Sequence, residues 1–237
     1  MEINIKDLLK AGVHFGHITR KWNPNMRPFI FMKKKGVHII DLCKTILKLK
    51  EACFEIKKIA IFGKKILLVG TKEQAREKIS FYAKSINMPC VTERWLGGFL
   101  TNFTTIRKSV KKMNGIERMK KNGTFDTLSK KEKILINRSY NKLYKNLGSI
   151  SNMNHIPGAI FLVDPNKEKI ALEEAKKLKI PTFAMVDTNT NPNDIKYPIP
   201  SNDDSSKSID IILKFFISYI KEGIDINRNI RYEKKIR

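Results

Sequence analysis

Short, continuous apolar runs constrain the fold of this chain more than any other feature. The clearest runs cover residues 66–70, 159–164 and 181–187, and apolar patterns with helical spacing follow them. A run without polar alternation is typical of a strand that is buried on both faces of a sheet. Strands that alternate with helices form parallel sheets, because each helix carries the chain back to the start of the next strand. We therefore predict an α/β fold with a Rossmann-like parallel sheet and helices on both of its faces.

The remaining elements of this domain follow from the same patterns. Helices are expected over residues 42–61, 75–86, 168–178 and 208–220, and residues 90–95 are a weaker strand candidate. The chain has 237 residues, 41% of them hydrophobic, which is enough to fill the core of one large domain with an appendage.

Residues 102–148 interrupt the alternation of strands and helices. An apolar stripe with helical spacing runs through the first half of this segment, breaks around Gly123 and resumes through the second half. Ser129 and Glu132 have the spacing of a capping box, which marks the start of a second helix. Two helices of similar length joined by a short turn form an antiparallel hairpin, and we expect it to pack as a coiled coil.

The hairpin divides the chain into three parts. We expect residues 1–101 and 149–223 to form the Rossmann-like domain, with residues 102–148 inserted between them. Residues 224–237 form a short basic tail that we expect to be disordered or tethered to RNA.

Positive charge points to a polyanionic partner. The formal net charge is +24, from 47 Lys and Arg against 23 Asp and Glu. Lys, Ile and Asn are abundant, which is typical of biased coding composition, so the placement of the charge says more than its total. The hairpin segment holds 13 basic residues and 3 acidic ones, and phosphate contacts are the expected use of such a surface, although an ordinary solvated face is the alternative. The hairpin residues predicted to contact RNA are Arg107, Lys108, Lys111, Lys112, Lys130, Lys131 and Arg138.

Two further basic clusters lie outside the hairpin. Residues 12–24 combine cations with aromatic rings, which suits irregular or single-stranded RNA, although Phe15 and Trp22 serve equally well to pin the N-terminal arm to the domain. A basic turn at residues 33–36 and Arg94, before two glycines, are the other candidates. The residues predicted to contact RNA here are His14, His17, Arg20, Lys21, Trp22, Lys33, Lys34, Lys35 and Arg94.

Acidic residues follow the ends of predicted strands. Asp187 ends a parallel strand, and Asp203 and Asp204 come later, so carboxylates gathered at one sheet edge, with His17, form a candidate Mg²⁺ or Zn²⁺ site. Helix caps and turns are the more common use of Asp and Asn at such places. We expect no cofactor.

Sequence signatures of enzymes are missing. The dinucleotide fingerprint is absent, and Gly70-Thr71-Lys72 lacks the preceding spacing of a phosphate-binding loop. A nucleotide-dependent enzyme therefore ranks far below an RNA-binding structural protein, and a protein-docking platform with incidental charge is a third alternative. The three cysteines form no C-x-x-C pair, and we see no signal peptide or membrane span, so we expect a soluble intracellular protein.

Ordered motifs along nearly the whole chain carry a family resemblance. They are AGVHFGH (11–17), WNP (22–24), VHIIDL (37–42), VGTK (69–72), RWLGG (94–98), LTN (100–102), EEA (173–175), IP (180–181), VDTN (186–189), IP (199–200) and NDD (202–204). In this order and spacing, between residues 8 and 223, the chain resembles the S-two family of small-subunit ribosomal proteins in its bacterial or organellar form. Ser201 departs from the glycine that the family often has before Asn202.

The resemblance implies a structural protein of the small ribosomal subunit, without catalytic activity, that supports translation. The partners it implies are small-subunit ribosomal RNA and neighbouring ribosomal proteins, in many bacteria the large messenger-binding protein. It implies neither a membrane partner nor a homo-oligomer. A ribosome-bound location in the cytoplasm follows, with an organelle ribosome left open.

Overall fold

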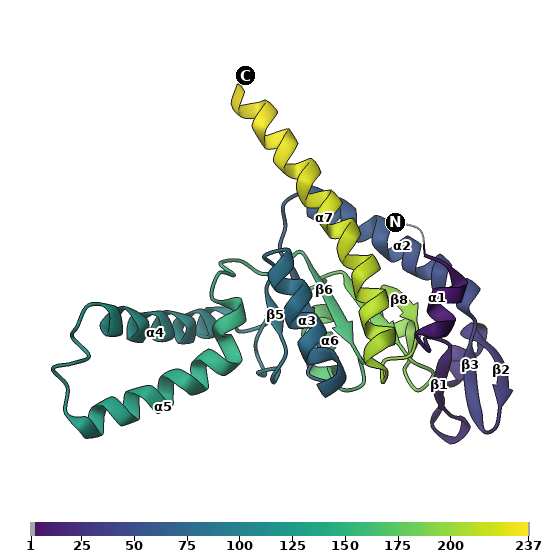
Figure 1. Cartoon of the computed structure of the whole chain (residues 1–237), viewed down its shortest axis with the longest axis horizontal. Coiled ribbons are helices and arrows are strands. Elements are labelled where there is room, and N and C mark those ends of the chain that lie inside the picture. Colours follow the sequence, from purple (N-terminus) through teal and green to yellow (C-terminus); the bar gives the residue numbers. More distant parts are fainter. Residues whose placement is uncertain (1–2, 237) are drawn as a thin grey trace.

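A five-stranded parallel sheet forms the centre of the molecule (Figure 1). The computed structural model describes the backbone of residues 3–236 and the side chains of residues 3–233. The strands lie in the order β5-β4-β6-β7-β8, and every neighbouring pair is parallel. Their bounds are β4 (Ile66–Val69), β5 (Cys90–Val91), β6 (Ala159–Val163), β7 (Thr182–Val186) and β8 (Tyr197–Pro200).

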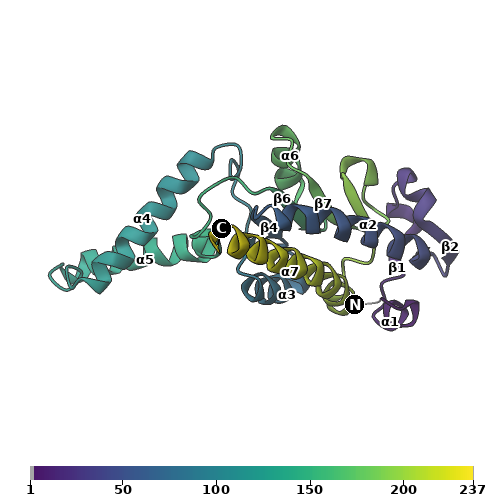
Figure 2. The same ribbon diagram turned by 90° about the horizontal axis from the view of Figure 1, so that it is seen from above.

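Helices cover both faces of this sheet, as predicted. The helices are α2 (Leu42–Ile61), α3 (Glu73–Ser85), α6 (Lys169–Lys177) and α7 (Ser206–Ile236). Alternate side chains of β6 enter two different cores: Phe161 packs with residues of α2, α3 and α7, whereas Ile160 packs with residues of α6. Figure 2 accordingly places α6 on one side of the sheet and α3 and α7 on the other. The predicted α/β fold with a two-sided parallel sheet is confirmed.

The strand order creates a topological switch point between β4 and β6. β4 comes first in the chain but lies inside the sheet, so the connections run in opposite directions from the gap between β4 and β6. Ligands of open α/β sheets bind at the carboxyl ends of the strands at such a switch point. A ligand of this sheet would therefore contact the residues that follow β4 and β6.

A second, antiparallel sheet at the N-terminus was not predicted. It has the order β1-β3-β2 and is preceded by a short helix. Its elements are α1 (Ile5–Lys10), β1 (Phe15–Ile18), β2 (Ile30–Lys34) and β3 (Val37–Ile40), with two 3₁₀ turns, η1 (Thr19–Lys21) and η2 (Pro24–Phe29), between β1 and β2. Lys35 and Gly36 both have positive φ and make the β2–β3 turn. Such short strands carry too few residues for a period of two to be recognised.

The inserted helices are present. α4 (Phe103–Lys121) and α5 (Lys130–Leu147) contact one another and extend away from the sheet (Figures 1 and 2). The predicted capping box at Ser129 and Glu132 is confirmed. Coiled-coil geometry of this pair and the boundaries of the three parts of the chain stay predictions. A third, short 3₁₀ turn, η3 (Gly148–Ile150), follows α5.

Three elements differ from their predicted form. α7 continues to Ile236, so the disordered alternative for the tail is wrong for the described residues, whereas the tether to RNA stays a prediction. β8 was missed because Pro198 and Pro200 argue against a strand, yet β8 is an edge strand, where proline is tolerated. β5 ends at Val91 instead of reaching Trp95. Among residues 3–236, no helix combines the length and the hydrophobicity that a membrane span requires.

Candidate nucleic-acid interface

The segment that enters the hairpin wraps around one buried carboxylate. Glu174 of α6 accepts hydrogen bonds from the backbone N–H groups of Gly98, Leu100 and Thr101, at 2.8, 2.8 and 3.1 Å. Gly98 has a φ of +81°, a conformation that favours glycine. Space does not require glycine at position 97, because a Cβ there would meet nothing within 4 Å. The hairpin therefore starts from a fixed base on the sheet.

The outer surface of the hairpin carries unpaired positive charge. Eight of its cations are exposed and form no ion pair within the part of the chain whose side chains are described. They are Lys108, Lys111, Lys112, Arg118, Lys130, Lys131, Arg138 and Lys142. Six of the seven predicted hairpin contacts are in this set, and Arg118 and Lys142 join them. Because the hairpin extends from the body, these charges are accessible to an extended polyanion (Figure 1).

Arg107, the seventh predicted hairpin contact, has a structural role. One of its guanidinium nitrogens, Nη1, donates to the backbone carbonyls of Ser151 and Met153, at 3.3 and 3.0 Å. These bonds tie α4 to the segment after α5 and leave the half-buried Arg107 turned toward the protein. Arg94, at the entry to the hairpin, is exposed and has no described ion pair.

Of the predicted RNA contacts near the N-terminus, some are exposed and others pack against the protein. Arg20 and Lys21 are exposed on η1, and Lys33, Lys34 and Lys35 are exposed around the β2–β3 turn. Trp22 is half-buried, and its ring lies 5.1 Å from that of the buried His38. This contact favours a pinning role for Trp22. His14 is half-buried beside Phe15, and burial lowers the pKa of His14.

His17 lies between two carboxylates at the carboxyl end of the parallel sheet. Its Nδ1 is 2.9 Å from Asp187 Oδ2 and its Nε2 is 3.4 Å from Asp204 Oδ2. The hydrogen bond with Asp187 is the main reason that the pKa of His17 is raised, against the opposing effect of burial. These three residues of the candidate metal site lie within 4.8 Å of one another. The pairing also joins β1 to the end of β7.

Asp203, the fourth metal candidate, pairs with a lysine instead. Lys72 Nζ lies 2.6 Å from Asp203 Oδ1, 2.6 Å from Asp204 Oδ1 and 3.3 Å from Asp164 Oδ2. Burial, together with the charges of Asp164 and Asp187, raises the pKa of Asp203 to about 7 in spite of Lys72. Lys72 thus supplies the positive charge that a bound cation would bring to these acids.

Acidic side chains of the chain itself also occupy the switch point between β4 and β6. The backbone N–H of Thr71 donates to the buried Glu168 at 2.8 Å, and Lys72 is held by three carboxylates. In a phosphate-binding loop, free N–H groups and a free lysine face the phosphates. Here both kinds of donor are occupied by acids of the chain itself, so the site is chemically unsuited to a nucleotide.

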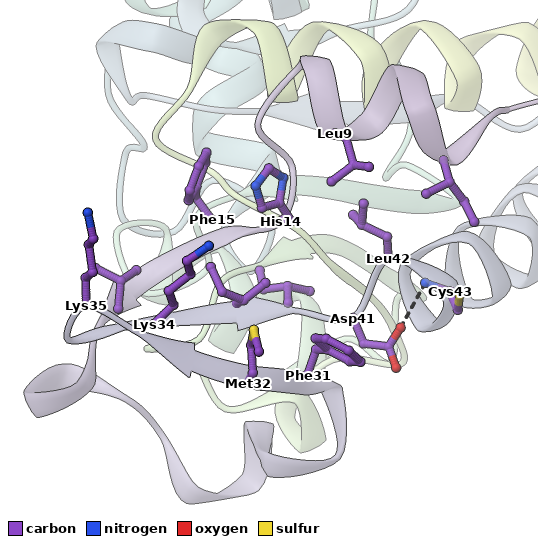
Figure 3. A pocket seen from close by; sticks show the side chains of 14 residues that line it. Leu9, His14, Phe15, Phe31, Met32, Lys34, Lys35, Asp41, Leu42 and Cys43 are labelled. Carbon is purple, nitrogen blue, oxygen red and sulfur yellow. Dashed lines mark hydrogen bonds between the residues drawn. The ribbon is translucent and has the colours of Figure 1, made fainter.

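An apolar groove lies between α1, the N-terminal sheet and the start of α2 (Figure 3). Its volume is about 600 Å³. Phe31 and Met32 of β2 line it beside Leu9 of α1, and Phe31 is 69% exposed. Lys34 and Lys35 lie at one end and Asp41 at the other. Exposed aromatic and apolar side chains gathered in a groove are typical of a protein contact.

Several of these functional features escaped sequence reasoning. Glu174 had a signal: it lies between Ala171 and Ala175 on the buried face of α6, where an unpaired acid is costly. Lys72 had none, because its three acidic partners are at least 92 residues away in the chain. The groove depends on the N-terminal sheet, which itself was not predicted.

Known proteins match this chain over most of its length. The ribosomal protein S2 family matches residues 8–223. The chain is 57% identical to small ribosomal subunit protein uS2 of Flavobacterium johnsoniae over 223 residues, which are 94% of this chain and 88% of the relative. Identity to the protein of the same name from Karelsulcia muelleri is 59% over 217 residues, 92% of this chain and 98% of the relative. For the Chlorobaculum tepidum protein it is 50% over 235 residues, 99% of this chain and 93% of the relative. The chain therefore belongs to the ribosomal protein S2 family.

Proposed function

We propose that this chain is a non-catalytic structural constituent of the small ribosomal subunit. In this role it binds small-subunit ribosomal RNA and neighbouring ribosomal proteins and thereby supports translation. The observation that carries the proposal is the hairpin surface, where eight exposed cations form no ion pair with the side chains of residues 3–233. Membership of a family whose relatives are named small ribosomal subunit proteins supports it independently.

The cations on the hairpin bind the phosphate backbone and do not read sequence. Lysine ammonium groups neutralise phosphates as point charges, so they fix the position of the protein on the RNA. Arg138 on the hairpin, with Arg94 and Arg20 outside it, adds planar guanidinium groups that bind phosphate through two parallel hydrogen bonds. His14, Lys21, Lys33, Lys34 and Lys35 extend the proposed RNA surface to the N-terminal sheet, whereas both ring nitrogens of His17 face carboxylates of the chain itself.

The groove between α1 and the N-terminal sheet supports a second, protein-facing contact. Its exposed Phe31 and Met32 suit an apolar segment of a neighbouring ribosomal protein, and the large messenger-binding protein of the small subunit is the candidate. We place the chain on cytoplasmic ribosomes, with an organelle ribosome as the alternative. Neither a membrane nor a second copy of the chain is part of the proposal.

Sedimentation tests this function. Tagged protein from cell lysate is run through a sucrose gradient in low salt, and then in high salt with Mg²⁺ retained. Co-migration with small subunits in both conditions is expected of an integral component. A peak that moves to the top of the gradient in high salt indicates loose association by charge alone, and it contradicts the proposal.

A further inference from the structure

We propose that the ring of Tyr144, near the base of the hairpin, is a stacking platform for an unpaired nucleobase. This inference rests on the RNA-binding function proposed above and adds a specific contact to it. Tyr144 lies on α5, and 59% of its surface is exposed. The basic residues of the hairpin hold a phosphate backbone, and Tyr144 offers an apolar face to one base.

Tyr140, Tyr144 and Gly148 lie one helical turn apart on the same side of α5 and form a ladder. The rings of Tyr140 and Tyr144 are stacked, with centroids 5.6 Å apart and planes inclined by 23°. Lys120 Nζ lies 4.2 Å from the centroid of Tyr140, within the range of a cation–π contact. Lys120 therefore contacts the Tyr140 end of the ladder, and Gly148 lies at the other end.

Gly148 places no side chain over one face of the Tyr144 ring. A Cβ on Gly148 would lie 3.3 Å from Cδ2, 3.3 Å from Cε2 and 3.5 Å from Cγ of Tyr144. Nearly equal distances to three adjacent ring carbons place that position over the face of the ring, because an approach in the ring plane would leave at least one of them clearly farther away. A Cβ there would partly occupy the space that a stacked base needs.

The charges around Tyr144 favour a nucleotide as the occupant. Lys145 follows Tyr144 in the chain, and its pair with Glu93, at 3.3 Å between Nζ and Oε2, is neutral but brings residues 93 and 94 near the ring. Arg94, the neighbour of Glu93, is exposed and forms no described ion pair. An aromatic face beside cations binds a base by stacking and its phosphates by charge, which is how proteins hold unpaired RNA.

Binding to purified small-subunit ribosomal RNA, at fixed salt and Mg²⁺, tests the inference on the full chain. We expect Tyr144→Ala to weaken binding about 10-fold, because one base loses its stacking partner, and Tyr144→Phe to bind as the wild type does. Gly148→Ala should also weaken binding. The φ of Gly148 is −57°, which alanine adopts readily, so its added methyl acts on the ring face and not on the backbone. Phe81→Ala, which removes an exposed ring on α3, is the matched control and should change nothing.

Ultraviolet crosslinking supplies a second measurement that does not depend on affinity. A peptide containing Tyr144 should carry a nucleotide after irradiation, and Gly148→Ala should reduce its yield. Saturable binding by the wild type, with Tyr144→Ala equally tight and no adduct at Tyr144, overturns the inference and leaves the proposed function standing. Absence of saturable binding by the wild type overturns both. Circular dichroism of each variant verifies folding, and if Tyr144→Ala does not fold, Gly148→Ala and the crosslink decide.

Discussion

The indole Nε1 of Trp95 donates a hydrogen bond of 3.0 Å to the carboxylate of Glu174, and both residues are buried. This bond joins the loop that starts the hairpin to α6 on the sheet. Burial alone would raise the pKa of Glu174, but hydrogen bonds from Trp95 and from the backbone of Thr101, Leu100 and Gly98 outweigh it, so the pKa is lowered. The ionised carboxylate is thus the form around which the loop is built.

Replacing this carboxylate should weaken the fold. We expect Glu174→Gln to lower the free energy of unfolding by about 2 kcal/mol. The glutamine amide has only one acceptor oxygen, whereas both oxygens of the carboxylate accept hydrogen bonds, and its NH₂ group would face the N–H donors of the loop. Glu173→Gln is the control, since Glu173 is exposed and its nearest pair, with Lys169, spans 3.9 Å; it should stay within about 0.5 kcal/mol of the wild type. Urea unfolding measures both, and equal effects would contradict the proposed anchor.

The hairpin charges should decide assembly without affecting the fold. Reversal of Lys108, Lys111, Lys112 and Lys131 to Glu changes the charge by eight units at positions whose side chains are exposed. We expect the circular dichroism to stay unchanged and incorporation into small subunits to fail.

A matched variant controls for net charge. Lys177, Lys207, Lys214 and Lys221 are exposed on α6 and α7, and their reversal to Glu should leave incorporation near the wild-type level. If both variants lose incorporation equally, total charge and not the hairpin is responsible.

The His17 pairing predicts a pH dependence of stability. Hydrogen bonding to Asp187 raises the folded-state pKa of His17 above 6.5, so its stabilisation is full below that pH and is lost as the pH rises through the folded-state value. We expect His17→Gln to cost about 1 kcal/mol at pH 6 and less at pH 8. Asp203, whose pKa is about 7, titrates in the same window, so the difference between wild type and variant is the quantity to compare.

Urea unfolding in chelator-containing buffer at the two pH values tests this dependence. The exposed His155 supplies a control, and His155→Gln should show no such trend. A cost of His17→Gln that stays constant or grows toward pH 8 would argue against the charged pairing.

Removal of Lys72 should be more damaging than removal of a surface lysine. Lys72→Met leaves the fully buried Asp203 without its cation, a loss that costs about 3–5 kcal/mol in comparable buried pairs. Lys78→Met breaks a more exposed pair with Asp210, at 3.1 Å, and should cost less than about 1 kcal/mol. Thermal unfolding of the two variants compares them directly, and similar midpoints would show that the switch point tolerates an unpaired acid.

Phe31 should matter for a neighbouring protein and not for this chain alone. Because Phe31 is mostly exposed, Phe31→Ser should change the free energy of unfolding by no more than about 0.5 kcal/mol. If the groove is a docking site, small subunits assembled with this variant should be depleted of one protein. Mass spectrometry of purified subunits measures that stoichiometry, and an unchanged protein content would count against the groove.

Local sequence determined the parallel sheet, its covering helices and the two hairpin helices. α2 begins and ends where the pattern predicts, at Leu42 and Ile61, and the capping box at Ser129 specifies the start of α5. These features follow from periodicity and caps, which act between residues a few positions apart. The hairpin cations were likewise readable, because a helix with one narrow apolar stripe must expose the rest of its surface.

Only the tertiary structure decided which charged groups are free and which are used within the protein. Arg107 and Lys108 are neighbours in the chain, yet Arg107 donates to the backbone of Ser151 and Met153, while Lys108 is exposed and pairs with no described side chain. In the sequence, Lys72 resembles a lysine that binds phosphate, but in the structure it pairs with Asp164 and Asp203. The physical reason is that pairing of buried charges depends on contacts between distant segments, which local patterns do not encode.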